Sequence, residues 1–353
     1  MIHVQPNLAR LSAYVPPWVG IDRAKYLRLD LNECTQPLPP VVVEQLARYI
    51  REKGVQSYPD YTDFLPQLSA YCGLPTNHLL LTNGSDEGIV CILRALLAPG
   101  DSMVIARPEF AMFGRLAEML GVKIIGVPYG PAFEYPYQAF DEAIPRDAGL
   151  IVIINPNNPT GTPVALDYVK KVLREHPDTP VLVDEAYYEY TGCTAVEFLA
   201  EHENLILLRT FSKAFAMAGL RLGYVMARPE FIAELKKVRG PFDVNCLALQ
   251  AAGGQLAHPE TRQAHLAEVM NVSKPFTEEM LRSCGIEFVP GAANFLLAAP
   301  PDRDRMVAYL KSRGILVFPM RAPRLEKMVR MSFGTLAEMQ TVRDALTRFV
   351  RGA

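Results

Sequence analysis

The middle of the chain alternates short apolar runs with segments of helical length, and this alternation constrains the fold more than any other feature. Several runs are apolar without a polar residue at every second position, which is typical of strands covered on both faces. The predicted strands span residues 79–82, 103–106, 123–127, 150–154, 181–183, 205–210 and 222–226. The segments between them predict helices at residues 86–97, 111–120, 166–175 and 229–238. This order predicts an α/β fold with a mostly parallel, seven-stranded sheet sandwiched by helices.

The pattern changes after about residue 240, where the helical segments become longer and the strands fewer. The predicted helices there span residues 247–256, 261–281, 303–313 and 336–350. Short strands are predicted at residues 287–289, 295–298 and 328–333. We therefore assign residues 31–240 to a large domain, and residues 1–30 and 241–353 to a smaller α+β domain with an N-terminal arm.

Composition excludes several classes of protein. Half of the 353 residues are hydrophobic and 21% are charged, which rules out a disordered or fibrous chain. The 36 basic and 38 acidic residues give a net charge of −2, so we expect no nucleic acid partner. No signal sequence and no apolar run near the ~20 residues that span a bilayer are visible. Six scattered cysteines without a C-x-x-C pair indicate thiols in a reducing compartment. We expect a cytoplasmic protein with no membrane contact and no metal site.

Four polar clusters fall at the predicted carboxyl ends of strands, where open α/β sheets bind their ligands. The first is the turn TNGSDE at residues 82–87. Gly84 permits a tight turn, and the amides of Ser85 and Asp86 would be free donors at a helix N-terminus, which suits a phosphate. The alternative is an ordinary helix cap formed by Ser85 or Asp86.

The second and third clusters follow neighbouring buried strands. NPNNPTG at residues 155–161 forms a rigid turn that can hydrogen-bond a planar polar group, although ordinary turn chemistry is the alternative. DEAY at residues 184–187 puts a carboxylate at the mouth of a buried strand, where it is costly unless paired. Asp184 therefore needs a salt bridge or a protonated heterocycle, unless it caps a helix or faces solvent.

The fourth cluster is TFSK at residues 210–213, followed by AGLRLG at residues 218–223. Lys213 lies among small residues after a predicted buried strand, and a desolvated lysine can lose its proton and act as an amine nucleophile. The alternative is a surface lysine. Together, a phosphate turn, a carboxylate for a ring nitrogen and an amine nucleophile are the parts that bind pyridoxal 5′-phosphate.

These motifs resemble those of the pyridoxal-phosphate-dependent, fold-type I aminotransferases of class I/II. Within that class the chain is most similar to the histidinol-phosphate aminotransferase family. The similarity extends along nearly the whole chain, through LSAYVP, LNE at 31–33, YPD at 58–60, NPNNPTG, DEAY, SKAFAMAGLRLG, VRGPFDVN at 238–245, ANF at 293–295 and VRMSFGT at 329–335.

The resemblance implies a role for each matching position around the cofactor ring. Lys213 would bind the cofactor covalently and then move the proton between the substrate α-carbon and the cofactor. Asp184 would pair with the ring nitrogen, while Tyr187 and Asn158 would hydrogen-bond the ring oxygen. Phe110 would stack on the ring.

The phosphate of the cofactor and the substrate would be held by further residues that the resemblance identifies. Besides the turn at Gly84, the phosphate ligands are expected to be the backbone amides of Ser85 and Asp86, with Thr210, Ser212 and Arg221. Arg330 would clamp the substrate carboxylate with its bidentate guanidinium, and Asn32 and Tyr14 would lie beside the substrate. Tyr58 would reach the phosphate in the partner subunit's site, which implies a homodimer with shared active sites. As alternatives, Arg330 could lie on the surface, and Tyr14 and Tyr58 could be packing aromatics.

Two departures from the family pattern concern the substrate. Relatives that use histidinol phosphate commonly carry an arginine where this chain has Phe318, and Arg321 could compensate only if its loop delivers it. The usual Asn-Pro after LNE is replaced by CTQP at residues 34–37. Both changes leave the cofactor residues untouched. The exchange of a charged phosphate clamp for Phe318 favours an apolar or aromatic side chain on the substrate.

We predict a transaminase that moves an amino group between an amino acid or amino-alcohol phosphate and a 2-oxo acid. Decarboxylation, elimination or cyclisation on the same fold is the alternative reaction. A non-catalytic protein with this fold would be expected to lack Lys213 or Asp184, and both are present.

Overall fold

Two β-sheets organise the computed structural model, which describes residues 2–4, 6–9, 11–13 and 19–351. The larger sheet has seven strands in the order β2-β8-β7-β6-β5-β3-β4. Its strands are β2 (Leu79–Thr82), β3 (Ser102–Arg107), β4 (Lys123–Pro128), β5 (Leu150–Ile154), β6 (Val181–Asp184), β7 (Leu205–Thr210) and β8 (Gly223–Met226). Only β8 runs against its neighbours, pairing antiparallel with both β2 and β7. The predicted α/β class and the mostly parallel seven-stranded sheet are confirmed.

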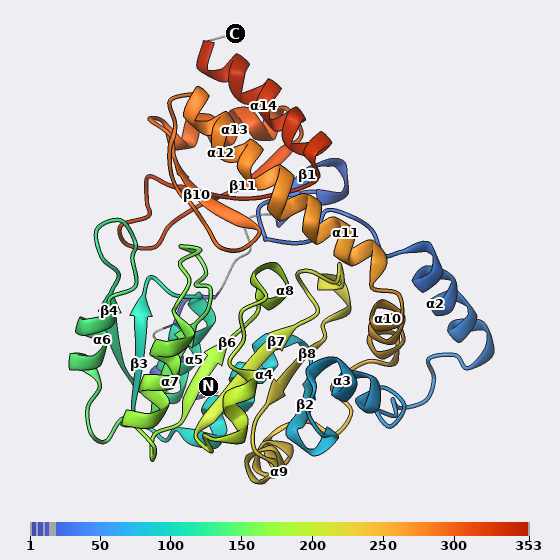
Figure 1. Ribbon diagram of the computed structural model, residues 1–353, viewed down its shortest axis with the longest axis vertical. Helices are drawn as coiled ribbons and strands as arrows, with labels where there is room; N and C mark the ends of the chain where they lie inside the picture. The colour runs from blue at the N-terminus through green and yellow to red at the C-terminus, as the bar shows by residue number, and fades with distance from the viewer. Residues whose placement is uncertain (1, 5, 10, 14–18, 352–353) are drawn as a thin grey trace.

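Helices cover both faces of this sheet (Figure 1). The helices of this part of the chain are α2 (Pro40–Glu52), α3 (Leu65–Cys72), α4 (Gly84–Leu96), α5 (Ala111–Leu120), α6 (Tyr137–Ala143), α7 (Leu166–Glu175), α8 (Tyr188–Thr191), α9 (Pro229–Val238) and α10 (Cys246–Ala257). Successive strand residues point to opposite faces, so Ile151 and Ile153 of β5 join one hydrophobic cluster and Val152 joins the other. Side chains of α6 and α7 complete the first cluster, and those of α4, α5 and α9 complete the second.

The smaller sheet has five strands in the order β1-β11-β12-β10-β9. Its strands are β1 (Leu27–Leu29), β9 (Glu287–Val289), β10 (Phe295–Ala299), β11 (Ile315–Pro319) and β12 (Val329–Ser332). It packs with α12 (Lys274–Ser283), α13 (Arg303–Ser312) and α14 (Leu336–Arg351). Because β1 runs parallel to β11, the N-terminal segment is part of the same sheet as strands from near the C-terminus. The domain boundaries at residues 30/31 and 240/241 stay a prediction.

The helices differ from the prediction at several points, and α6 and α8 were not predicted. The predicted helix over residues 261–281 is divided into α11 (Glu260–Glu268), a π-helical turn (Val269–Ser273) and α12. Pro275 in the first turn of α12 has no N–H to donate to the preceding turn, which accounts for the change in winding. Helices α2 and α3 were not predicted, and α10 packs against both. No helix in the described part of the chain is both long and apolar enough to cross a membrane.

Candidate active site

The four clusters singled out in the sequence meet at one edge of the larger sheet. They follow β2, β5, β6 and β7, whose carboxyl ends point toward the smaller sheet (Figure 1). Side chains of both sheets meet there, because Arg330 of β12 donates a hydrogen bond of 2.7 Å to Asn158. The predicted site therefore lies between the two sheets.

Lys213 lies at this edge, three residues beyond the end of β7. Its Nζ donates a hydrogen bond of 2.9 Å to the carbonyl oxygen of Leu31. Burial, and then the positive charge of Arg330, lower the pKa of Lys213 from its ordinary value to about 8. A lysine in these surroundings is neutral at a much lower pH than a surface lysine, so it can act as a nucleophile.

Asp184 is the last residue of β6 and is 4% exposed. Its Oδ1 accepts a hydrogen bond of 3.0 Å from the backbone amide of Ala186. Burial raises the pKa of Asp184 to about 7, although the hydrogen bond from Ala186 and, more weakly, the charge of Lys213 oppose this rise. A carboxylate desolvated in this way gains from a cation beside it, and a protonated ring nitrogen is one such cation.

Tyr187 and Asn158, which follow β6 and β5, are both buried and accept hydrogen bonds from distant parts of the chain. The Tyr187 hydroxyl accepts a hydrogen bond of 2.9 Å from Asn32 Nδ2. Asn158 Oδ1 accepts the bond from Arg330 Nη1 already described. Three predicted residues from distant parts of the chain, Asn32, Tyr187 and Asn158, are thus brought to the same edge as Lys213.

The turn between β2 and α4 depends on two glycines that allow a close approach. Gly84 has φ of +77°, and a Cβ built there would lie 2.3 Å from Nη2 of Arg221. A Cβ at Gly223 would lie 2.4 Å from the amide nitrogen of Ser85. Gly84 is favoured there by its positive φ, and Gly223 by the close approach of the backbone at the start of α4.

The remaining predicted phosphate ligands surround that turn. Arg221 Nη1 donates to Ser212 Oγ at 3.2 Å, and Nη2 donates to Asp86 Oδ2 at 3.2 Å. Thr210 Oγ1 accepts a hydrogen bond of 3.1 Å from the Ser212 amide. A guanidinium, two hydroxyls and the N-terminus of a 13-residue helix form a cradle that fits a phosphate group.

Arg330 is buried, with 8% of its surface exposed. Its Nη2 donates to the carbonyl oxygen of Asp30 at 2.8 Å. Its guanidinium carbon lies 4.9 Å from the ring centre of Phe318 and 5.7 Å from that of Phe295. The head group is therefore held by polar contacts between two aromatic walls, and it is not a surface residue.

Two predicted residues, Phe110 and Tyr58, have none of the hydrogen bonds described above, and a third is not described. Phe110 precedes α5 and packs, half-buried, against the second hydrophobic cluster. Tyr58 is 78% exposed and stacks on Phe242 with ring centres 4.4 Å apart, so its predicted role at a partner's site stays a prediction. Tyr14 lies outside the described residues.

Residues around the LNE motif contact the site in ways that sequence reasoning missed. Ser332 Oγ donates to Asn32 Oδ1 at 3.0 Å, and Asn294 Nδ2 donates to the Asn32 carbonyl at 3.3 Å. The carbonyls of Asp30 and Leu31 accept from Arg330 and Lys213. Leu31, Asn294 and Ser332 lie in the motifs LNE, ANF and VRMSFGT, which carried the family resemblance. These motifs were the sequence signal that could have identified the three residues.

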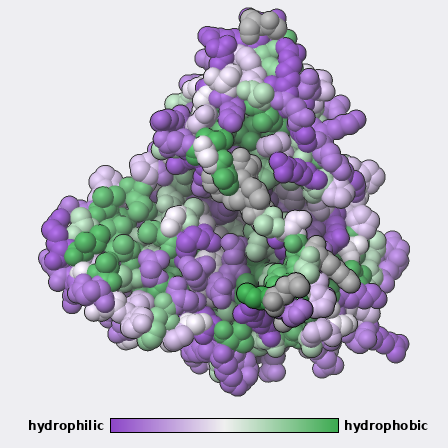
Figure 2. All heavy atoms as spheres, turned by 180° about the vertical axis from the view of Figure 1, so that it is seen from behind, coloured by the Kyte–Doolittle hydropathy of each residue, from purple (hydrophilic) through white to green (hydrophobic). Residues whose placement is uncertain are grey.

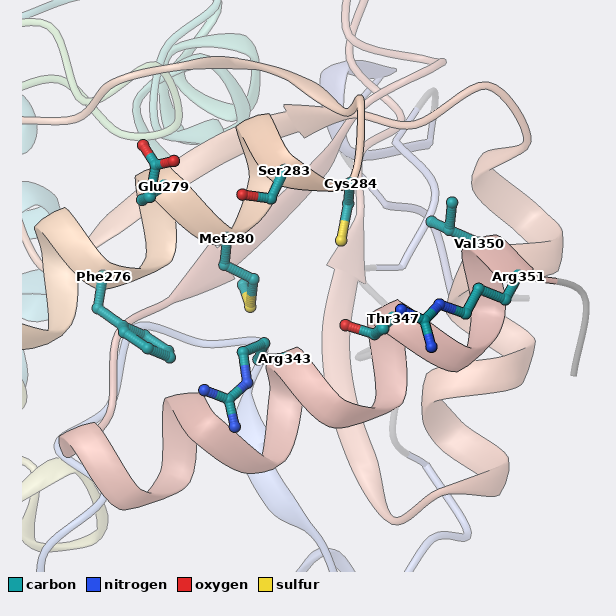
Figure 3. Close-up of a pocket in the computed structure, with 9 residues that line it drawn as sticks. All are labelled: Phe276, Glu279, Met280, Ser283, Cys284, Arg343, Thr347, Val350 and Arg351. Carbon is teal, nitrogen blue, oxygen red and sulfur yellow. The ribbon is translucent and has the colours of Figure 1, made fainter.

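A separate hollow of about 360 Å³ lies between α12 and α14 (Figure 3). Phe276 and Met280 of α12 and Arg343 of α14 point into it. Its lining, as far as the described residues define it, contains none of the predicted site residues. It is not the site that the motifs form.

The sequence matches the family model of aminotransferase class I and II over residues 24–346. The chain belongs to the class I and II aminotransferases. Membership of this family confirms the predicted transaminase activity and pyridoxal phosphate as the cofactor. The phosphate cradle, the buried carboxyl of Asp184 and the buried amine of Lys213 fit that cofactor.

This aminotransferase is similar to histidinol-phosphate aminotransferases from two bacteria. Identity with the protein of Citrifermentans bemidjiense is 33%, covering 98% of both chains. Identity with that of Roseiflexus castenholzii is 32%, covering 97% of both chains. Among solved structures, the histidinol-phosphate aminotransferase of Sinorhizobium meliloti in complex with pyridoxal-5′-phosphate superposes with a TM-score of 0.90. The two share 24% identity over 100% of this chain and 98% of the other.

Proposed function

We propose that Lys213 holds the cofactor and moves the proton in an amino-group transfer from an aromatic amino acid to a 2-oxo acid. Bound pyridoxal phosphate supplies an electron-withdrawing ring that stabilises negative charge at the substrate α-carbon. The buried Lys213 amine, with its pKa lowered to about 8, can take up and return a proton near neutral pH. Its position among residues of both sheets supports this role.

Asp184 keeps the ring nitrogen protonated. Its carboxylate is buried and therefore stabilises a cation beside it more strongly than a solvated carboxylate would. Tyr187 and Asn158 hydrogen-bond the ring oxygen. The cradle of Ser85, Thr210, Ser212, Arg221 and their neighbours at the start of α4 binds the phosphate and fixes the orientation of the ring.

Arg330 binds the α-carboxylate of each substrate. Its Nη1 and Nη2 both donate within the protein, which fixes the plane of the guanidinium before a substrate arrives. The proposed specificity rests on Phe318, whose ring centre lies 4.9 Å from the guanidinium carbon of Arg330. Together with Phe295 it makes the surroundings of the carboxylate clamp aromatic, which suits an aromatic side chain.

Histidinol phosphate is the second candidate donor, because relatives 33% and 32% identical carry its name. Binding its phosphate would need a cation near the substrate side chain. Phe318 provides no charge, and Arg321, in the loop between β11 and β12, is exposed. We therefore expect histidinol phosphate to be the poorer donor.

The test is a panel of amino donors added singly to the purified enzyme with its cofactor. Loss of the visible absorbance band of the lysine-bound cofactor reports the first half of the reaction. We expect fast loss with phenylalanine and tyrosine and slow loss with histidinol phosphate. Faster loss with histidinol phosphate than with any aromatic amino acid would overturn the proposed substrate class while leaving the transaminase assignment intact.

We also infer a homodimer with shared active sites. Hydrophobic surface gathers on the lobe that contains α2, at the left of the molecule as seen from behind (Figure 2). Exposed apolar side chains of this region include Val41, Val43, Ile50, Val55 and Tyr58. An apolar surface of this kind suits burial against a second copy, and the exposed Tyr58 is then available to the partner's phosphate cradle.

We assign the enzyme to the cytoplasm. All six cysteines are free thiols, including the exposed Cys193, and this favours a reducing compartment. The small-molecule amino donor and the oxo-acid acceptor are its expected partners besides the second subunit.

A further inference from the structure

Residues 30–35, which we call the strap, cross the candidate site between the two sheets. On the side of the larger sheet the strap contacts two residues of the cofactor site. The Leu31 carbonyl accepts from Lys213 Nζ at 2.9 Å, and Asn32 Nδ2 donates to the Tyr187 hydroxyl at 2.9 Å. The position of the strap therefore bears directly on the groups that react.

The strap is fastened on the side of the smaller sheet. The Asn32 amide donates to Ser332 Oγ at 3.0 Å, and Ser332 Oγ donates in turn to Asn32 Oδ1 at 3.0 Å. Farther along, Thr35 Oγ1 donates to Glu338 Oε2 of α14 at 2.6 Å. Asn32 has φ of +55°, in the left-handed region that asparagine tolerates better than most residues other than glycine.

Arg23 holds the start of the strap through two carboxylates. Its Nη2 lies 2.7 Å from Asp30 Oδ1 and 2.7 Å from Glu33 Oε2, and its Nη1 lies 3.2 Å from Glu33 Oε1. The side chain of Arg23 is 15% exposed and that of Asp30 is 5% exposed. The planar fork of one guanidinium thus joins two acidic residues that would otherwise repel each other across the strap.

Asp30 also contacts Arg330 through its backbone. Its carbonyl oxygen accepts from Arg330 Nη2 at 2.8 Å, while Arg330 Nη1 is bonded to Asn158. One of the hydrogen bonds that orient the Arg330 guanidinium therefore comes from a residue whose side chain Arg23 holds. A shift of Asp30 would remove that contact or turn the guanidinium.

We propose that Arg23 is a positioning residue for substrate binding, which fixes the Asp30 carbonyl and through it the orientation of Arg330. This inference rests on the proposed role of Arg330 as the carboxylate clamp. It assigns Arg23 no contact with the substrate. Without Arg23, Asp30 is a buried carboxylate that has lost its cation, and the strap moves toward water to solvate it.

The test compares Arg23→Ala with Lys25→Ala. Lys25 lies on the same short helix (Arg23–Lys25) and pairs with Asp22 at 3.6 Å on the exposed surface, so its variant is the matched control. Two non-reacting probes, 3-phenylpropanoate and its neutral amide, are titrated into the holoenzyme as competitive inhibitors. For Arg23→Ala we expect about tenfold weaker binding of the carboxylate, the size of one lost charged hydrogen bond. Binding of the amide and the visible band of the bound cofactor should change less than about twofold.

Equal weakening of both probes by Arg23→Ala would indicate a general structural effect and would overturn the proposal. The proposal would also be overturned if Arg23→Ala bound the carboxylate as tightly as Lys25→Ala does. If Arg23→Ala does not fold because Asp30 is left charged, Arg23→Lys replaces it, and weaker binding of the carboxylate with unchanged binding of the amide is again expected. Arg23→Lys can pair with one carboxylate but cannot bridge both, so we expect it to weaken carboxylate binding less than Arg23→Ala does.

Arg330→Lys separates this inference from the proposed function. If Arg330→Lys leaves carboxylate binding unchanged, Arg330 does not bind the carboxylate, and the inference about Arg23 is overturned as well. If Arg330→Lys weakens the carboxylate and Arg23→Ala does not, the clamp stands and only the role of Arg23 is overturned.

Discussion

Arg330 Nη1 and Asn158 Oδ1 are joined by a buried hydrogen bond of 2.7 Å that spans 172 positions of the sequence. It links β12 of the smaller sheet to the turn that follows β5 of the larger sheet. The proposed carboxylate clamp and a proposed ring ligand are therefore in direct contact. Substrate binding at Arg330 is thereby connected to the residues that orient the cofactor.

Arg330 also affects the titration of Lys213. Burial and the Arg330 cation lower the pKa of Lys213 to about 8, so the neutral amine becomes the major form above that pH. We expect the rate at which the cofactor-free protein captures pyridoxal phosphate to rise with pH and to level off above pH 8. Arg330→Met removes a nearby positive charge, which raises the pKa of Lys213 and moves the profile to higher pH. Stopped-flow absorbance over a pH series measures this, with Lys236→Ala as a surface control. An unmoved profile in Arg330→Met would contradict it.

Phe318 is expected to select the substrate side chain. In Phe318→Ala, KM for aromatic donors should rise about tenfold, since aromatic packing and apolar burial together amount to ~1–2 kcal/mol. KM for glutamate should change little, because its side chain has no ring to pack there. Steady-state kinetics with phenylalanine and glutamate give the change in KM for each donor. An equal rise in KM for both donors would refute this role.

Two defective variants should complement each other if the active sites are shared between subunits. In a hybrid dimer of Lys213→Ala and Tyr58→Ala, one site has both Lys213 and the partner subunit's Tyr58. Random mixing then restores up to about a quarter of the wild-type activity. Activity is measured after the subunits are mixed under mild denaturant and returned to buffer. A mixture no more active than Tyr58→Ala alone would argue against a shared site.

The buried ion pair behind the site should be important for stability. Arg209 and Glu185 are 2% and 1% exposed, and Arg209 Nη2 lies 2.8 Å from Glu185 Oε2. Arg209→Ala leaves the Glu185 carboxylate buried without its cation, so we expect the free energy of unfolding to fall by about 3–5 kcal/mol. Urea denaturation measures the change, with the exposed Arg174→Ala as control. A loss no larger than that of the control would show that water solvates Glu185.

The central strands of the larger sheet could be predicted because they are buried on both faces and therefore form unbroken apolar runs. β5 was predicted to the residue, and all five of its residues are buried. Helix α2 was missed because its start, PVVV, is rich in β-branched residues that favour strands. Packing against α10 stabilises it as a helix, and such a contact has no local signal.

Most of the residues proposed to hold the cofactor could be singled out from the sequence because they lie in short motifs directly after a strand. The contacts of the strap could not be predicted, because most of them join residues that are far apart in the sequence. Asn32 and Ser332 are 300 positions apart, and neither the left-handed backbone of Asn32 nor the bond from Arg23 to Asp30 follows from a spacing. Arg23 in particular lies in a segment with no motif of its own.

The central claim is that the amine of Lys213 carries the cofactor. The direct measurement is reduction of the holoenzyme with sodium borohydride, followed by tryptic digestion and mass spectrometry. Reduction makes the bond to the lysine permanent and blocks cleavage there. The account predicts one pyridoxyl-phosphate mass on the peptide of residues 210–221 and no label in Lys213→Ala. Stoichiometric label on any other lysine, with residues 210–221 unmodified, would contradict it.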